Sequence, residues 1–143
     1  MIGVASAAVL VLVVGSVALA ASAASTHLKA TLNVGQEVPK PKVKAPGGTG
    51  TFTATLSGTK LTWKLTFKGL SGKAGAAHIH TGRVGKAGNV AVSLCGPCAS
   101  GVSGKATLTS AQVKAILGGG TYVNVHTAKN AGGEIRGQIK KGM

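Results

Sequence analysis

Apolar and polar side chains alternate residue by residue along most of the chain after residue 26. The alternation is clearest in 49–56 and 60–68, where apolar residues occupy every second position and Thr or Lys most of the others. Successive side chains of a strand point to opposite faces, so this period of two predicts a hairpin with one apolar face and one Thr/Lys face. Trp63 and Phe67 lie on the apolar face, and we expect both in the core.

Similar patterns, separated by Gly-rich turns, predict six further strands and one helix. We expect these strands at 27–34, 75–81, 89–94, 102–108, 122–127 and 133–140. Ser110 can cap a short helix over 111–117, with Val113, Ile116 and Leu117 as its buried stripe and Gly118 after its end. The segment 37–48 is rich in Pro and Lys and is expected to be an extended loop. Short strands with one helix before the last hairpin predict an all-β sandwich.

The N-terminal segment differs from the rest of the chain. No Lys, Arg, Asp or Glu occurs from residue 2 to residue 28, and the run 4–21 is apolar. Followed by the small residues Ala21 and Ala23, it is typical of a signal peptide cleaved after Ala23. It is also long enough to be an uncleaved membrane anchor. Both readings of residues 1–25 place a single domain, 27–141, outside the cytoplasm, in a secreted or membrane-anchored protein.

The charge is strongly positive, with sixteen Lys and Arg against two Glu and a net charge of +14. Such a chain attracts polyanions. Specific nucleic-acid binding is disfavoured because Lys predominates over Arg and only four Phe, Trp and Tyr are present to stack on bases. Anionic cell-wall or extracellular polymers fit an exported protein better. The alternative is that the lysines only keep strand surfaces soluble and unpaired.

Three histidines are candidate metal ligands. His78 and His80 are two residues apart on a predicted strand and therefore project from the same side, and His126 lies on a later strand. Three imidazoles could hold one Zn²⁺ or Cu²⁺ ion, with Glu134 as a further candidate ligand. The alternative is a hydrogen-bonded network in which the histidines join Asn124, Glu134 and Arg136, which share the polar face of the last two strands. On that hairpin Val123, Val125, Ile135 and Ile139 are expected to face the core, with Tyr122 and Gln138 on the polar face.

The two cysteines form the sequence Cys95-Gly96-Pro97-Cys98. These letters match a thioredoxin active site, but the residues that follow are rich in Gly and Ser and do not predict the helix that activates such a thiol. In an exported protein the pair is expected to form a local structural disulfide.

Five ordered segments resemble the CHRD domain family, named for its occurrence in chordin. They are 36–39 (Gln-Glu-Val-Pro), 69–70 (Gly-Leu), 77–80 (Ala-His-Ile-His), 122–127 (Tyr-Val-Asn-Val-His-Thr) and 133–138 (Gly-Glu-Ile-Arg-Gly-Gln). The resemblance covers residues 28 to 139 and implies a Greek-key β-sandwich, for which the alternation predicts seven or eight strands. The family brings no defined activity. The His-x-His pair on a sandwich is also similar to copper-zinc superoxide dismutase, although the chain has no Asp and no second histidine cluster for a dinuclear site.

Few residues support hydrolytic catalysis. The chain has no Asp and only two Glu, and no Ser lies in a Gly-x-Ser-x-Gly turn. We therefore expect a non-catalytic surface or extracellular binding module, with no cofactor required. The competing hypothesis is a mononuclear zinc or copper protein, with a dismutase-like activity as its catalytic form.

Overall fold

The computed structural model describes residues 23–44 and 46–142 and confirms an all-β fold with one short helix. Most of the predicted signal or anchor segment, residues 1–22, lies outside this range. Among the residues that are described, none belongs to a helix with the length and apolar character needed to span a bilayer. The strands are β1 (Ser25–Asn33), β2 (Thr49–Ser57), β3 (Lys60–Lys68), β4 (Ala74–Thr81), β5 (Val90–Cys95), β6 (Val102–Thr107), β7 (Thr121–Thr127), β8 (Ile135–Gln138) and β9 (Lys140–Lys141).

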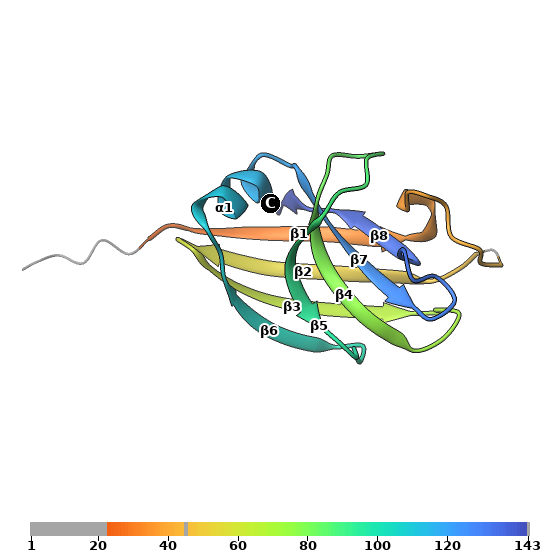
Figure 1. Ribbon diagram of the computed structural model, residues 1–143. Coiled ribbons are helices and arrows are strands. Elements are labelled where there is room, and N and C mark those ends of the chain that lie inside the picture. Colours follow the sequence, from red (N-terminus) through yellow and green to blue (C-terminus); the bar gives the residue numbers. More distant parts are fainter. Residues whose placement is uncertain (1–22, 45, 143) are drawn as a thin grey trace, which may run out of the picture.

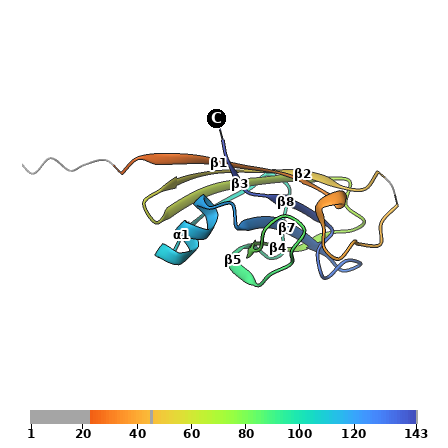
Figure 2. The ribbon, with the colours of Figure 1, turned by 90° about the horizontal axis from the view of Figure 1, so that it is seen from above.

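The strands form two packed layers that are joined along one edge. The order of pairing is β5-β4-β7-β8-β1-β2-β3-β6, and β9 adds to β1. Figure 2 shows β1, β2 and β3 above β4, β5 and β7, while β8 lies between the layers and pairs with both β7 and β1. The chain changes layer after β3, after β5 and after β6, which is the non-sequential connectivity of a Greek-key sandwich.

The core fills the space between the layers with the apolar side chains that the alternation predicted. Trp63 is only 5% exposed, whereas Phe67, near the end of β3, is half-buried and packs against the edge of the core. From the other layer, Ile79, Val123, Val125 and Ile135 are fully buried against it. The strand faces that were predicted to be apolar therefore do form the core, although Phe67 is more exposed than expected.

The helix α1 (Ser110–Leu117) lies at one end of the sandwich, near the start of β1 (Figure 1). Its N-cap is Thr109, not Ser110 as predicted. The Thr109 hydroxyl accepts a hydrogen bond from the backbone N–H of Gln112, and the side-chain carbonyl oxygen of Gln112 accepts one from the backbone N–H of Thr109. This reciprocal capping box favours Thr109 because Gln112 stands three residues after it. Ile116 enters the core as expected.

The last predicted strand, 133–140, is two shorter strands. β8 pairs with β7, and after Ile139 the chain continues as β9 beside the first half of β1. Gly137 lies so close to β1 that a Cβ atom there would be 2.5 Å from the Thr31 carbonyl oxygen. β1 begins two residues before the predicted strand 27–34 and ends one residue before it, at Asn33, whose side chain caps the 3-10 turn Val34–Gln36 by accepting a hydrogen bond from the Gln36 backbone amide.

The face of β4, β7 and β8 that points away from the core is polar, as predicted, but it is also covered. Tyr122, Asn124, Arg136 and Gln138 are all at most 7% exposed. The segment 82–89 lies over this face, because Arg136 donates hydrogen bonds to backbone carbonyls of that segment and Gln138 donates to the Gly82 carbonyl. The sandwich thus has a second, polar interior outside its apolar core.

Candidate metal centre

The structure brings His78, His80 and His126 together on this covered polar face. His78 and His80 lie on β4, and His126 lies on the neighbouring β7, where it pairs with Ala76. The ring centroids are 5.5 Å apart for His78 and His80, 4.8 Å for His78 and His126, and 5.8 Å for His80 and His126. One nitrogen atom from each ring lies within 4.8 Å of the others.

Backbone carbonyl groups orient two of the three imidazoles. His80 Nδ1 is 2.9 Å from the Gly88 carbonyl oxygen, and His126 Nδ1 is 2.9 Å from that of Ala131. A carbonyl oxygen can only accept, so each Nδ1 carries a proton, and in the neutral imidazole each Nε2 then keeps its lone pair. This pairing of an imidazole N–H with a backbone carbonyl is the usual outer-shell support of a metal-ligating histidine.

His78 faces His126, with its Nδ1 atom 3.0 Å from His126 Nε2. Because His126 Nε2 is unprotonated in this arrangement, His78 Nδ1 donates the hydrogen bond. His78 would have to carry its proton on Nε2 instead in order to offer Nδ1 to an ion. The hydrogen bond and a shared ion are therefore alternative states of the same pair of nitrogens.

The His80 Nε2 atom is buried and has no hydrogen-bond partner among the described residues. The whole side chain is 8% exposed. A buried polar atom without a partner costs stability, because it loses its hydrogen bond to water on folding. The site therefore contains a desolvated lone pair at one of its three candidate ligand atoms.

A stack of side chains holds His80 in place. The Tyr122 ring is nearly parallel to the His80 ring, with an angle of 8° and a centroid distance of 5.1 Å. The guanidinium carbon of Arg136 lies 3.4 Å from the Tyr122 centroid, in a cation–π contact. The Tyr122 hydroxyl also accepts a hydrogen bond from the Gly88 amide. Gly88 thus fixes both rings, and a Cβ atom at this position would be 1.8 Å from the Thr81 carbonyl oxygen.

Burial and mutual proximity favour neutral imidazoles. Burial lowers the pKa of His78 below its ordinary value, and the neighbouring His126 and His80 lower this pKa further. Burial likewise lowers the pKa of His126, against the opposing effect of its hydrogen bond to Ala131. Neutral imidazole is the form that binds metal, so protons compete less with an ion here than at an exposed histidine.

Glu134 serves a different purpose from the histidines. It is fully buried, and its carboxylate accepts hydrogen bonds from the Ser71 amide and hydroxyl, the Thr127 hydroxyl and the Asn130 amide group. Burial raises the pKa of this carboxyl, but the hydrogen bonds outweigh it and leave the pKa below its ordinary value. Glu134 therefore ties together the segments around Ser71 and Asn130, and the three histidines alone form the cluster of candidate ligands found among the described residues.

Asn124 and Arg136 belong to a second buried group, centred on Glu37. Glu37 is 1% exposed, and burial raises its pKa to about 7, although Arg136, the Val38 amide and Asn124 oppose this effect. One oxygen of Glu37, Asn124 Oδ1 and Arg136 Nη1 lack hydrogen-bond partners within the described part of the chain. Sequence reasoning missed Glu37, because a charged residue in a Pro/Lys-rich loop gives no sign of burial. It missed Tyr122 and Gly88 as supports of His80 for a similar reason.

The cysteines form the predicted local disulfide between Cys95 and Cys98. The bridge closes the end of β5 beside β4, where the Cys98 amide donates a hydrogen bond to the Ala74 carbonyl oxygen. Cys95 is followed by a turn and not by a helix. The disulfide therefore stabilises the edge of the layer that carries His78 and His80.

Comparison with known protein families confirms the resemblance that the five sequence segments indicated. The family model described as the CHRD domain matches residues 28–139, which is most of the chain. Searches of curated proteins and of solved structures found no match.

Proposed function

The chain belongs to the CHRD domain family, and from this premise we propose that it is a non-catalytic extracytoplasmic module that binds one Zn²⁺ or Cu²⁺ ion through His78, His80 and His126. The observation that carries the proposal is the buried His80 Nε2 atom, which has no partner while the other ring nitrogen is held by Gly88. An ion at this point would supply the missing partner.

The distances support a single ion with little rearrangement. Three atoms no more than 4.8 Å apart all lie within about 2.8 Å of a common point. Metal–nitrogen bonds are about 2.0–2.1 Å long, so each nitrogen would have to move about 0.7 Å closer to that point. Binding therefore needs the imidazoles to close by roughly 1 Å or less. Small rotations of His78 and His126, which are less buried than His80, can supply this movement.

The chemistry of the ligands favours zinc or copper. Three neutral nitrogen donors without a thiolate or a carboxylate suit Zn²⁺ and Cu²⁺ better than the oxygen-binding ions Mg²⁺ and Ca²⁺. Three protein ligands leave at least one position for water or another small ligand. We assign no catalytic step to that position, and a dismutase-like reaction is the alternative that a bound copper ion would allow.

The proposed location outside the cytoplasm is supported by two features. The disulfide between Cys95 and Cys98 is of a kind that persists in oxidising compartments. The apolar run of residues 4–21 is typical of an export segment, whether it is cleaved or retained as an anchor.

Isothermal titration calorimetry of the metal-free domain with Zn²⁺ and with Cu²⁺, together with thermal unfolding at each ion concentration, tests the proposal. We expect one ion per chain and a rise in melting temperature, because a ligand present at about a hundred times its dissociation constant stabilises the folded state by about 3 kcal/mol. His80→Gln should abolish both effects. Cu²⁺ bound at the site should show hyperfine coupling to nitrogen in its electron paramagnetic resonance spectrum.

The matched control is His27→Gln. His27 is exposed on β1, outside the three-histidine cluster, and its only side-chain hydrogen bond in the described structure is to Thr55. This variant should bind metal as the wild type does. The proposal is wrong if neither ion binds, or if His80→Gln binds as tightly as the His27→Gln control.

A further inference from the structure

The outer face of the layer formed by β1, β2, β3 and β6 has an unusually uniform composition, and we call it the lysine–threonine face. Its outward positions hold only Lys, Thr and Ser, apart from His27 and Asn33 on β1. The lysines are Lys29, Lys60, Lys64, Lys68 and Lys105. No carboxylate, Phe, Tyr or Trp occupies an outward position on these four strands. It lies on the opposite side of the sandwich from the three histidines.

Strand register gathers several of these lysines into rows across the sheet. Lys29 pairs with Thr53, which pairs with Lys64, so the two lysines are two strand spacings or about 10 Å apart. On its other side Lys29 is directly opposite Lys140 of β9. Lys105 is opposite Thr62 in the adjacent row. Like charges directly opposite each other destabilise a sheet, and a bound anion would relieve that repulsion.

A shallow hollow of about 510 Å³ lies on this face between the rows. Lys29, Lys64, Thr53 and Thr62 are among the residues that line it. All four of these residues are exposed. Ammonium groups attract anionic groups, while threonine hydroxyls both donate and accept hydrogen bonds, as sugar hydroxyls require.

We propose that the lysine–threonine face binds an acidic polysaccharide, whose carboxylate or sulfate groups pair with Lys29, Lys64, Lys105 and Lys140. A nucleic acid fits this face less well, because the face has no Phe, Tyr or Trp on which bases could stack. An acidic polysaccharide fits it by charge complementarity. Both Glu side chains of the protein are buried, so no acidic side chain lies at the surface to pair with these lysines. The proposal is independent of the metal site.

Binding of a defined-length oligogalacturonate, measured by fluorescence anisotropy at several salt concentrations, tests this inference. The triple variant K29Q/K64Q/K105Q should bind about tenfold more weakly and with a smaller dependence on salt, because three exposed ion pairs are removed. A neutral maltooligosaccharide of the same length should not bind.

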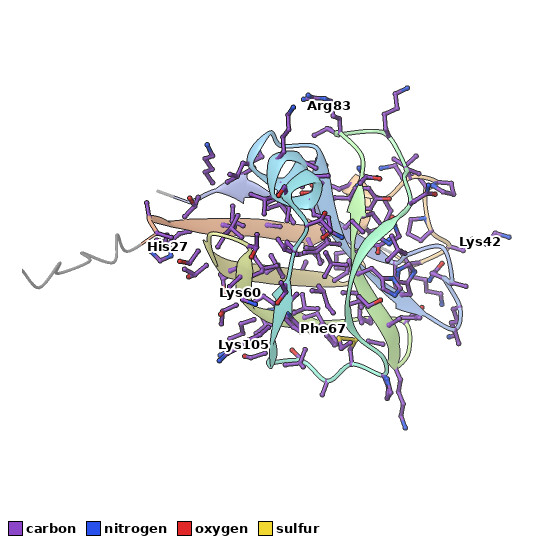
Figure 3. The ribbon with its side chains drawn as sticks, turned by 60° about the vertical axis from the view of Figure 1, so that its left-hand side comes forward. His27, Lys42, Lys60, Phe67, Arg83 and Lys105 are labelled. Carbon is purple, nitrogen blue, oxygen red and sulfur yellow. A yellow bond between two sulfur atoms is a disulfide. The ribbon has the colours of Figure 1, made fainter. Side chains whose placement is uncertain are left out.

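The matched control is K42Q/K44Q/K129Q, which removes the same charge from exposed loop positions. Figure 3 shows Lys42 on the opposite side of the molecule from Lys60 and Lys105. The control should retain wild-type affinity, and K29R/K64R/K105R should restore binding because it keeps the charge. Equal weakening in the two Gln variants would overturn the proposal, since net charge alone would then explain binding. So would tighter binding of a single-stranded oligonucleotide with the same dependence on Lys29, Lys64 and Lys105.

Discussion

At the scale of single residues, the unusual features of this protein are its two carboxylates, both of which are buried in polar surroundings. Glu134 is saturated with hydrogen bonds, and its pKa is lowered. Glu37 has an oxygen without a partner, and its pKa is raised to about 7. Two residues of the same type therefore respond to pH in opposite ways, because one receives enough hydrogen bonds to offset its burial and the other does not.

Glu37 should make folding stability fall as pH rises. The folded protein holds the Glu37 proton up to about pH 7, while the unfolded chain releases it near 4.5. The folded state therefore binds more protons between these values. The resulting contribution of Glu37 to the free energy of unfolding, about 3 kcal/mol, is fully present below pH 4.5 and is lost as pH passes 7.

His78 and His126 act in the opposite direction. Their lowered pKa values stabilise the fold above the ordinary histidine pKa, and this contribution is lost as pH falls.

Comparison with Glu37→Gln isolates the effect of Glu37, because the histidines are present in both proteins. Urea unfolding in EDTA between pH 5 and pH 8 should show the difference in unfolding free energy moving in favour of the variant as pH rises. A difference that stays constant across this range would show that Glu37 does not titrate there.

At the scale of elements, β3 organises the layer opposite the histidines. Trp63 is buried and lies beside Gly104 of the edge strand β6, where a Cβ atom would be 2.4 Å from the indole ring. The glycine thus leaves room for the indole, and the indole covers the glycine backbone. Phe67, four residues along β3, lies at the margin of the same core.

Trp63→Ala should therefore be among the most destabilising single changes in the domain. Replacing a buried Trp by Ala typically costs about 3–5 kcal/mol, from lost burial and the cavity that remains. Phe67→Ala on the same strand is the matched control and should cost less, because Phe67 is half-buried. Chemical denaturation of both variants checks this order, and a larger loss for Phe67→Ala would contradict the assigned core.

Strand alternation was sufficient to predict β1 to β7, since a half-buried strand records its two faces in every pair of residues. Trp63 and Val123 were placed correctly for this reason. Alternation could not show that the polar face of β4, β7 and β8 is covered, because the covering segment 82–89 has the composition of an ordinary loop. The break between β8 and β9 was missed because it reflects a change of pairing partner, from β7 to the first half of β1, that residue types do not record.

The candidate site was partly visible in the sequence for a similar reason. The spacing of His78 and His80 placed both on one side of a strand, but the proximity of His126 depends on the pairing of β4 with β7. The support given by Gly88 and Ala131 involves backbone carbonyls, which any residue possesses. The kinds of candidate ligand can therefore be predicted from residue types, whereas the positions and orientations of their side chains depend on the fold.

At the scale of the whole molecule, charge is segregated by depth. All fourteen lysines are exposed, and both Glu side chains are buried. The surface therefore carries one sign of charge from side chains, and the folded state has to tolerate the mutual repulsion of its lysines.

This repulsion should make the domain more stable as salt increases. The Debye length falls from about 30 Å at 0.01 M to about 8 Å at 0.15 M, so salt screens the lysines from each other across the surface. Because the unfolded chain spreads the same charges further apart, screening helps the folded state more. We expect the melting temperature to rise between 10 and 150 mM NaCl. Sucrose at matched osmolality is the control for effects not due to charge, and a melting temperature that falls with NaCl would show that attractive interactions between charges dominate in this fold.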